Sequence, residues 1–148
     1  MKKLTLFLAI SFLSTGLFAQ ILKPVKWSYA AKKISKTEAV LLLKATIDNG
    51  WHIYSTQQKD GGPVKTEFTF TPSKDYTLNG AVAEPKPVTK FENAFKMNVL
   101  YFEKSVIFQQ KIKLKKDQTD IKGKVEFMVC NDKQCLPPDD FEFSIPVK

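Results

Sequence analysis

An alternation of apolar and polar residues is the feature that most constrains the fold of this chain. Residues 124–130 and 141–147 carry an apolar side chain at every second position, and residues 39–48 and 66–71 show the same period. Period-two alternation is typical of a β-strand with one face in the core and the other toward water. The sequence therefore predicts half-buried strands as its main elements.

The segments between these strands complete the expected architecture. Residues 84–95 start with the sequence Glu-Pro-Lys-Pro and are expected to form an irregular loop, whereas residues 99–114 are expected to form one long strand with a bend or bulge. No helical period and no internal repeat is visible, so about seven or eight short strands predict an all-β, antiparallel β-sandwich. A short first strand is expected at residues 27–31, a weaker strand at residues 76–83, and a turn at residues 117–123.

Cys130 and Cys135 are the only cysteines, and four residues separate them. They lie between two of the alternating segments, so they are expected at the connection of two neighbouring strands, at one end of a sheet. A disulfide that closes so short a loop stabilises a fold by only about 2 kcal/mol, against roughly 4.7 kcal/mol for a loop of 100 residues. Such a pair can open without unfolding the domain, and exposed disulfides are the labile ones. The spacing therefore favours exchange chemistry over a structural staple but leaves both open.

The amino-terminal residues have the layout of a secretory signal peptide. A basic start is followed by an apolar run over residues 4–13 and a cleavage site after Ala19. The run is too short for a good membrane span, so we expect a chain that does not itself cross a membrane. Cleavage of residues 1–19 leaves residues 20–148 as a single domain, periplasmic or otherwise exported, where disulfide chemistry is favoured.

The charge of the chain argues against a nucleic-acid partner. The formal net charge of +8 falls to +6 when Lys2 and Lys3 leave with the signal peptide, and the chain contains no arginine. Its lysines are scattered, whereas nucleic-acid sites usually combine arginine forks with clustered basic patches. Weak attraction to acidic partners or surfaces remains open.

Residues 50–55, Gly-Trp-His-Ile-Tyr-Ser, contain the only histidine of the chain. In an extended segment His52 and Tyr54 lie on the same face. Taken alone, this pattern favours a partly exposed histidine beside a tyrosine that buries its ring at the rim of the core.

Two further stretches have unusual composition. Phe91 and Phe95 lie in a polar segment, and exposed aromatic side chains are costly unless they cover something. Such residues usually close the edge of the core. Pro137 and Pro138 follow the second cysteine closely and make this segment rigid, because each proline fixes its φ angle.

Together these stretches resemble the amino-terminal periplasmic domain of the DsbD family of thiol:disulfide interchange proteins. The resemblance lies in residues 48–55, the Phe95 loop, Tyr101 and residues 125–138. Its most specific elements are the Gly-Trp-His-Ile-Tyr-Ser stretch and the Cys-x4-Cys-x-Pro-Pro stretch. It implies an immunoglobulin-like sandwich whose cysteine pair lies on neighbouring strands, with no cofactor and no metal.

The resemblance also implies roles for individual residues. Cys130 and Cys135 are the expected catalytic redox pair, and Cys135 is the one expected to form mixed disulfides with partners. Phe95 is expected to shield the sulfurs. The residues expected to line or cap the site are His52, Tyr54, Glu92, Phe95 and Pro137.

The implied activity is that of a thiol:disulfide oxidoreductase acting as a relay. It passes reducing equivalents between a thioredoxin-like or membrane electron donor and periplasmic thiol proteins. The expected partners are thus thioredoxin-like exported proteins and a membrane electron-transfer protein. The cysteine spacing is one residue shorter than in some relatives, and the acidic positions before Phe95 are kept only as Glu92 with Asn93. Because the sequence ends after the domain, a separate electron donor is expected.

Two other hypotheses compete with the relay. One is a non-enzymatic β-sandwich binding module with a structural disulfide, which resists reduction while the domain is folded. The other is a copper site, because soft sulfur ligands suit Cu(I); beyond the cysteines, no metal-type spacing supports it. The ligands considered for this site are Cys130, Cys135, Met97, Met128 and His52.

Overall fold

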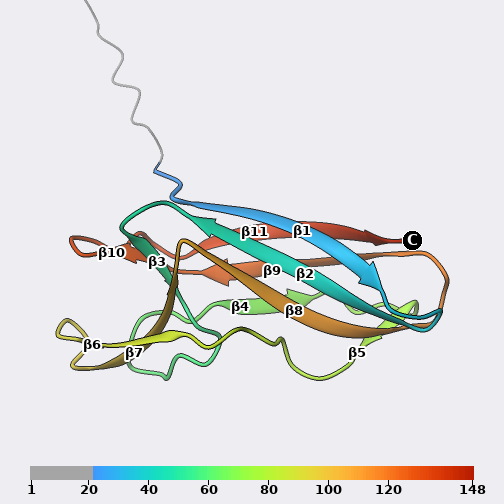
Figure 1. Cartoon of the computed structure of the whole chain (residues 1–148), viewed down its shortest axis with the longest axis horizontal. Helices are drawn as coiled ribbons and strands as arrows, with labels where there is room; N and C mark the ends of the chain where they lie inside the picture. Colours follow the sequence, from blue (N-terminus) through green and yellow to red (C-terminus); the bar gives the residue numbers. More distant parts are fainter. Residues whose placement is uncertain (1–21) are drawn as a thin grey trace, which may run out of the picture.

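The computed structural model describes residues 22–148, which form eleven β-strands (Figure 1). The expected signal peptide, residues 1–19, lies outside the described residues. Among residues 22–148, no helix has the length and apolar character needed to cross a membrane. The strands are β1 (Val25–Lys33), β2 (Glu38–Ile47), β3 (Trp51–Tyr54), β4 (Glu67–Phe70), β5 (Tyr76–Leu78), β6 (Val88–Glu92), β7 (Met97–Glu103), β8 (Ser105–Leu114), β9 (Thr119–Phe127), β10 (Val129–Asn131) and β11 (Asp139–Val147).

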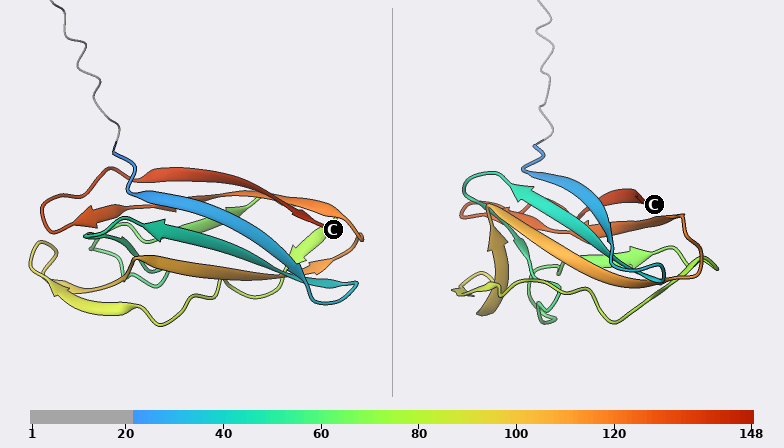
Figure 2. Two further views of the ribbon diagram at one scale, coloured as in Figure 1. Left: turned by 45° about the horizontal axis from the view of Figure 1, so that its top comes forward. Right: turned by 45° about the vertical axis from the view of Figure 1, so that its right-hand side comes forward.

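These strands form three antiparallel sheets. Sheet A has the order β1-β2-β8-β5, sheet B the order β10-β3-β7-β6, and sheet C the order β11-β9-β4. Sheets A and C lie against each other as the two layers of a sandwich, and the strands of sheet B gather at one end (Figures 1 and 2). The prediction of an all-β antiparallel sandwich is confirmed.

The main core lies between sheets A and C. Trp27 of β1 is partly buried and packs against this core, with its ring centroid 5.4 Å from that of Phe127 and 6.0 Å from those of Phe108 and Phe141. Aromatic pairs at such distances contribute about 0.5–1.5 kcal/mol each beyond the area they bury. The apolar faces predicted for the long strands are confirmed, because the following residues are buried: Leu41, Leu43, Ala45, Ile47, Val106, Phe108, Ile112 and Leu114.

Two sequence predictions in the middle of the chain were wrong. Part of the expected irregular loop is β6, which pairs with β7 as an edge strand. Its prolines precede the paired residues, so they cost no hydrogen bond of the ladder. The expected single strand over residues 99–114 is two strands that separate at Lys104, whose φ of 62° is left-handed. The chain thereby passes from sheet B into sheet A.

Two smaller differences concern strand ends. Of the strand expected at residues 76–83, only Tyr76–Leu78 forms a strand, β5. Ala83 then pairs with Gln109 of β8 as an isolated bridge. The expected turn at residues 117–123 is mostly strand, because β9 begins at Thr119. Gly123 lies within β9, and a Cβ atom there would approach the ring of Phe143 to 2.6 Å. Glycine at this position accommodates the aromatic ring and does not mark a turn.

Candidate functional site

The two cysteines lie on a narrow hairpin that leaves sheet C between β9 and β11. Pairing of these strands ends at Phe127 and Asp139, and β10 then turns aside to pair with β3. Cys130 and Cys135 face each other across the hairpin as an isolated antiparallel bridge, with Cα atoms 4.0 Å apart and a disulfide between them. The expected position, at the connection of two neighbouring strands and at one end of a sheet, is confirmed. We call residues 130–135 the cysteine hairpin.

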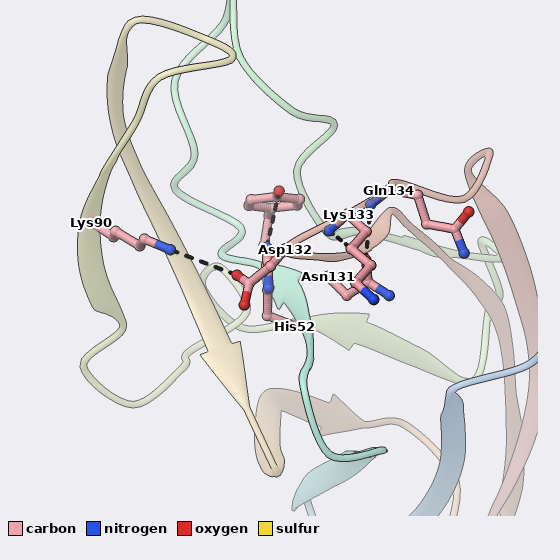
Figure 3. Close-up of polar contacts among 7 residues, drawn as sticks. His52, Lys90, Asn131, Asp132, Lys133 and Gln134 are labelled. Atoms are coloured by element: carbon pink, nitrogen blue, oxygen red, sulfur yellow. Dashed lines mark hydrogen bonds and ion pairs between the residues drawn. The ribbon is translucent and has the colours of Figure 1, made fainter.

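The tip of the cysteine hairpin is held by local hydrogen bonds. The Oδ1 atom of Asn131 accepts the backbone N–H groups of Lys133 and Gln134, both at 2.8 Å (Figure 3). The backbone N–H of Asn131 donates to the carbonyl of Gln134 at 2.8 Å. Asparagine commonly closes turns in this way, because its side chain bonds to the backbone that follows it.

The two cysteines differ sharply in exposure. Cys130 is 2% exposed, whereas Cys135 is exposed. Thiol–disulfide exchange requires attack on one sulfur through an intermediate mixed disulfide, so access selects the sulfur that reacts. The hairpin therefore presents the Cys135 end of the disulfide to solvent and keeps the Cys130 end inside.

Strand register places further side chains on the face that carries Cys130. Cys130 is paired with His52 of β3, and His52 is paired with Glu103 of β7. The neighbouring rung joins Tyr54 to Tyr101. Residues directly opposite each other in an antiparallel sheet point to the same face, so one face of sheet B carries all five side chains.

His52 and Tyr54 contact each other directly. The Nε2 atom of His52 lies 3.2 Å from the hydroxyl of Tyr54, and the ring of Tyr101 lies 4.9 Å from that of His52. Burial raises the pKa of Tyr54 to about 12, with a further contribution from the charge of Glu92, so its hydroxyl stays protonated. Burial lowers the pKa of His52, whereas the charges of Glu92 and Glu103 act in the opposite direction.

Cys130, Tyr54 and Val99 form a small buried group, the cysteine cluster, which is separate from the main core. Partly buried side chains pack around it, including Phe95 from the loop between β6 and β7. A hydrogen bond of 3.2 Å from the Phe95 N–H to the Glu92 carbonyl helps to close this loop. Phe95 thus packs on the cysteine cluster with a half-buried side chain. The other side chains that pack on the cluster are Met97, Tyr101 and Met128.

The end of β3 is anchored by polar contacts that the sequence did not indicate. The carboxylate of Glu84 accepts hydrogen bonds from the Ser55 hydroxyl and from the backbone N–H of Thr56, the latter at 2.9 Å. The Oε1 atom of the buried Gln58 accepts the N–H of Leu100 in β7 at 2.8 Å. The Glu84 contacts tie the segment after Tyr54 to the connection between β5 and β6, and the Gln58 contact ties it to β7.

The remaining lining residues fall in different places. Glu92 is half-buried and its charge acts on both His52 and Tyr54. Pro137 is exposed and does not belong to the cysteine cluster. It lines a mainly apolar groove of about 500 Å³ together with Val25 and Leu136.

Three charged residues near His52 were missed by sequence reasoning. Besides Glu103, Lys90 of β6 and Asp132 of the cysteine hairpin act on its pKa. The Lys90 Nζ atom lies 3.9 Å from Oδ1 of Asp132 (Figure 3), so an ion pair joins β6 to the cysteine hairpin. Both groups are exposed, and such pairs contribute only about 0–1 kcal/mol. Their proximity depends on pairing between distant strands, which gives no local sequence signal.

Comparison with known families gives one match that spans most of the chain. Residues 19–145 match the family described as thiol:disulfide interchange protein DsbD, N-terminal. A comparison with curated proteins gave no match.

Solved structures show the same fold. The N-terminal periplasmic domain of ScsB from Proteus mirabilis is similar over 83% of this chain and 46% of that chain, with 20% identity and a TM-score of 0.62. This chain therefore spans less than half of the ScsB chain. The Neisseria meningitidis DsbD N-terminal domain in the reduced form is similar over 84% of this chain and 89% of that chain, with 18% identity and a TM-score of 0.54.

A further solved structure contains a complex between the DsbD N-terminal and PilB N-terminal domains of Neisseria meningitidis. It is similar over 78% of this chain and 80% of that chain, with 15% identity and a TM-score of 0.51. At these identities the likenesses establish the fold, and they bear out the expected immunoglobulin-like sandwich.

Proposed function

The chain belongs to the family of DsbD N-terminal domains, and we propose that it is an exported thiol–disulfide exchange domain. In this proposal it relays reducing equivalents between a thioredoxin-like or membrane electron donor and periplasmic thiol proteins. The observation that carries the proposal is the unequal exposure of the two cysteines, with Cys130 at 2% and Cys135 exposed. In this proposal a partner attacks the sulfur of Cys135, and Cys130, which is held inside, is the resolving thiol.

The proposed reaction is ordinary thiol–disulfide exchange. A donor thiolate attacks Sγ of Cys135, the bond to Cys130 breaks, and the electron pair of that bond leaves with the Cys130 sulfur as a thiolate. A second donor thiolate then attacks the donor sulfur of the mixed disulfide and releases Cys135. Two electrons pass to the domain, and the donor becomes a disulfide. The same steps in reverse reduce an acceptor protein.

Equilibration of the folded domain with glutathione buffers tests this function. We expect the disulfide to open and close reversibly while the far-ultraviolet circular dichroism stays that of the folded domain. We also expect a reduction potential above the value of about −300 mV below which structural disulfides usually lie. A disulfide that stays closed until the domain unfolds would instead support a binding module with a structural staple.

The surroundings of Cys130 favour a second candidate, Cu(I) binding by the reduced domain. The methionines Met97 and Met128 pack on the cysteine cluster, and soft thioether and thiolate ligands suit Cu(I). Titration of the reduced protein with Cu(I) against a competing chelator tests this candidate. Loss of binding in a Met97→Leu variant that still exchanges disulfides would support it, and no binding would dismiss it.

A further inference from the structure

His52 occupies a position from which it can act on Cys130. The two residues are directly opposite in the antiparallel pair of β3 and β10, which places their side chains on one face. The Cβ atoms of such pairs lie about 4.5–5.5 Å apart. His52 is the only histidine of the chain, so no other imidazole is available at the site.

We propose that His52 is the base that takes the proton of the Cys130 thiol when this residue closes the disulfide and releases a bound partner. The proposal rests on the proposed exchange function and assigns the resolving step of that function. It requires no residue beyond those of sheet B and the cysteine hairpin.

Cys130 needs such a base because of where it lies. Its side chain is 2% exposed and belongs to an apolar cluster with Val99, so water has little access to the thiol. Exchange proceeds through the thiolate, and apolar burial disfavours this charged form. The described residues contain no helix, so no helix amino terminus is present among them to stabilise the thiolate.

The imidazole is held in place and is available in its basic form. Its Nε2 atom is 3.2 Å from the Tyr54 hydroxyl, and Tyr54 itself belongs to the cysteine cluster. Burial lowers the pKa of His52, which keeps the ring neutral and able to accept a proton near neutral pH. A base must come within reach of the proton it removes, and direct pairing in the ladder puts the side chains of His52 and Cys130 side by side on one face of sheet B.

The charged groups around His52 favour the imidazolium once it forms. Glu103 lies beside it on the same rung, and Glu92 acts on it from β6; both raise its pKa. Asp132 of the cysteine hairpin raises it as well, whereas Lys90 lowers it. The three carboxylates therefore offset part of the effect of burial, which remains the largest influence on the pKa of His52, and so ease formation of the imidazolium.

The step conserves atoms and electrons. It starts from Cys135 in a mixed disulfide with a partner sulfur and Cys130 as a thiol. His52 takes the thiol proton, and the Cys130 thiolate attacks Sγ of Cys135. The bond between the two cysteines forms while the bond to the partner sulfur breaks, and the partner leaves as a thiolate with the electron pair. The proton on His52 then passes to this thiolate or to water.

A pH-jump experiment measures the step directly. The reduced domain is first converted at low pH to the mixed disulfide with glutathione, using as the probe an activated glutathione disulfide whose leaving-group thiol has a low pKa. Closure is then started at a series of pH values between about 5 and 9, a range that spans the ordinary titration of histidine. Acid quenching and mass spectrometry follow the loss of the bound glutathione.

The wild-type closure rate is expected to level off above the pKa of His52. His52→Phe is expected to close about a hundredfold more slowly at neutral pH, because a general base typically contributes about a hundredfold or more. Its rate should continue to rise by about tenfold per pH unit as solvent removes the proton. His52→Gln, which retains a polar side chain beside Tyr54, should behave in the same way.

Two controls separate a chemical role from a structural one. Glu103→Gln removes a carboxylate that raises the pKa of His52, so the inflection of the closure profile should move to lower pH. A purely structural role of His52 does not shift this inflection. Denaturant melts of each variant show whether the domain remains folded.

The outcomes distinguish this inference from the proposed function. Closure profiles that are identical in the wild type and in a folded His52 variant would overturn the role of His52 and leave the exchange function intact. Failure of glutathione disulfide to oxidise the folded, reduced domain would overturn both.

Discussion

Replacing Phe95 by alanine distinguishes two roles of this residue, namely a cap over the disulfide and a member of the core. The ring is half-buried and packs on the cysteine cluster, so its removal is expected to cost about 1–2 kcal/mol of folding free energy. Truncation of a fully buried phenylalanine costs about 3–5 kcal/mol. If a reductant must displace the same ring to reach the sulfurs, 1–2 kcal/mol corresponds to about a five- to thirtyfold faster reduction.

The assay compares the rate of disulfide reduction by dithiothreitol with a denaturant melt of the same variant. Phe91→Ala is the matched control, because Phe91 lies on the same β6–β7 hairpin as Phe95. Its side chain is 57% exposed and is not among those that pack on the cysteine cluster. We expect Phe95→Ala alone to accelerate reduction. An unchanged rate with a stability loss of about 3–5 kcal/mol would refute the cap and make Phe95 a core residue. Equal acceleration by Phe91→Ala would assign the effect to the β6–β7 hairpin as a whole and not to the ring of Phe95.

Four other results are expected. Cys130→Ser should trap mixed disulfides with thioredoxin-like exported proteins through Cys135, whereas Cys135→Ser should trap few. Non-reducing electrophoresis of a periplasmic extract measures this difference. Equal trapping by the two variants would contradict the assignment of Cys135 as the residue that forms mixed disulfides. Burial lowers the pKa of His52 in the folded domain below its ordinary value of 6.5, so the unfolded chain binds a proton at this residue at higher pH than the folded domain does. The free energy of unfolding should therefore fall as the pH drops from 6.5 through the pKa of the folded domain. His52→Gln should abolish this part of the pH dependence in denaturant melts. Gly123→Ala should lower the free energy of unfolding by about 1–3 kcal/mol without changing the reduction rate, because its Cβ would clash with the Thr69 carbonyl oxygen. Oxidised and reduced domains should differ in stability by only about 2 kcal/mol in urea melts, and a much larger difference would indicate a staple.

The alternation of apolar and polar residues allowed prediction of those strands in which one face is buried in the core and the other faces solvent. Val125 and Phe127 lie in the main core, whereas Met128 and Cys130 face the cysteine cluster, as the period of two required. The strand β6 gave no such signal because most of its side chains are exposed. Its partner β7 stabilises it through backbone pairing, which sequence composition does not report.

Two features could not be predicted from the sequence, for different reasons. One is the break between β7 and β8, and the other is the set of charged residues around His52. Left-handed φ angles are usually signalled by glycine, and here Lys104 adopts one. Glu103, Lys90 and Asp132 belong to three different segments, and only the order of strands in sheet B brings their charges to the same histidine. Such a constellation follows from register between distant strands and not from local spacing.

The division of the core into two clusters bears on how the disulfide can open while the domain stays folded. Val129 packs in the main core, and Cys130, the next residue, packs in the cysteine cluster, so the boundary between the two falls within β10. Pairing of β9 with β11 ends at Phe127 and Asp139, before the chain enters the cysteine hairpin. Opening the disulfide therefore releases a short loop outside the sandwich ladder and leaves the contacts between sheets A and C in place. A disulfide between the two sheets would instead couple each redox step to the main core, and that coupling is absent from the arrangement of residues 22–148.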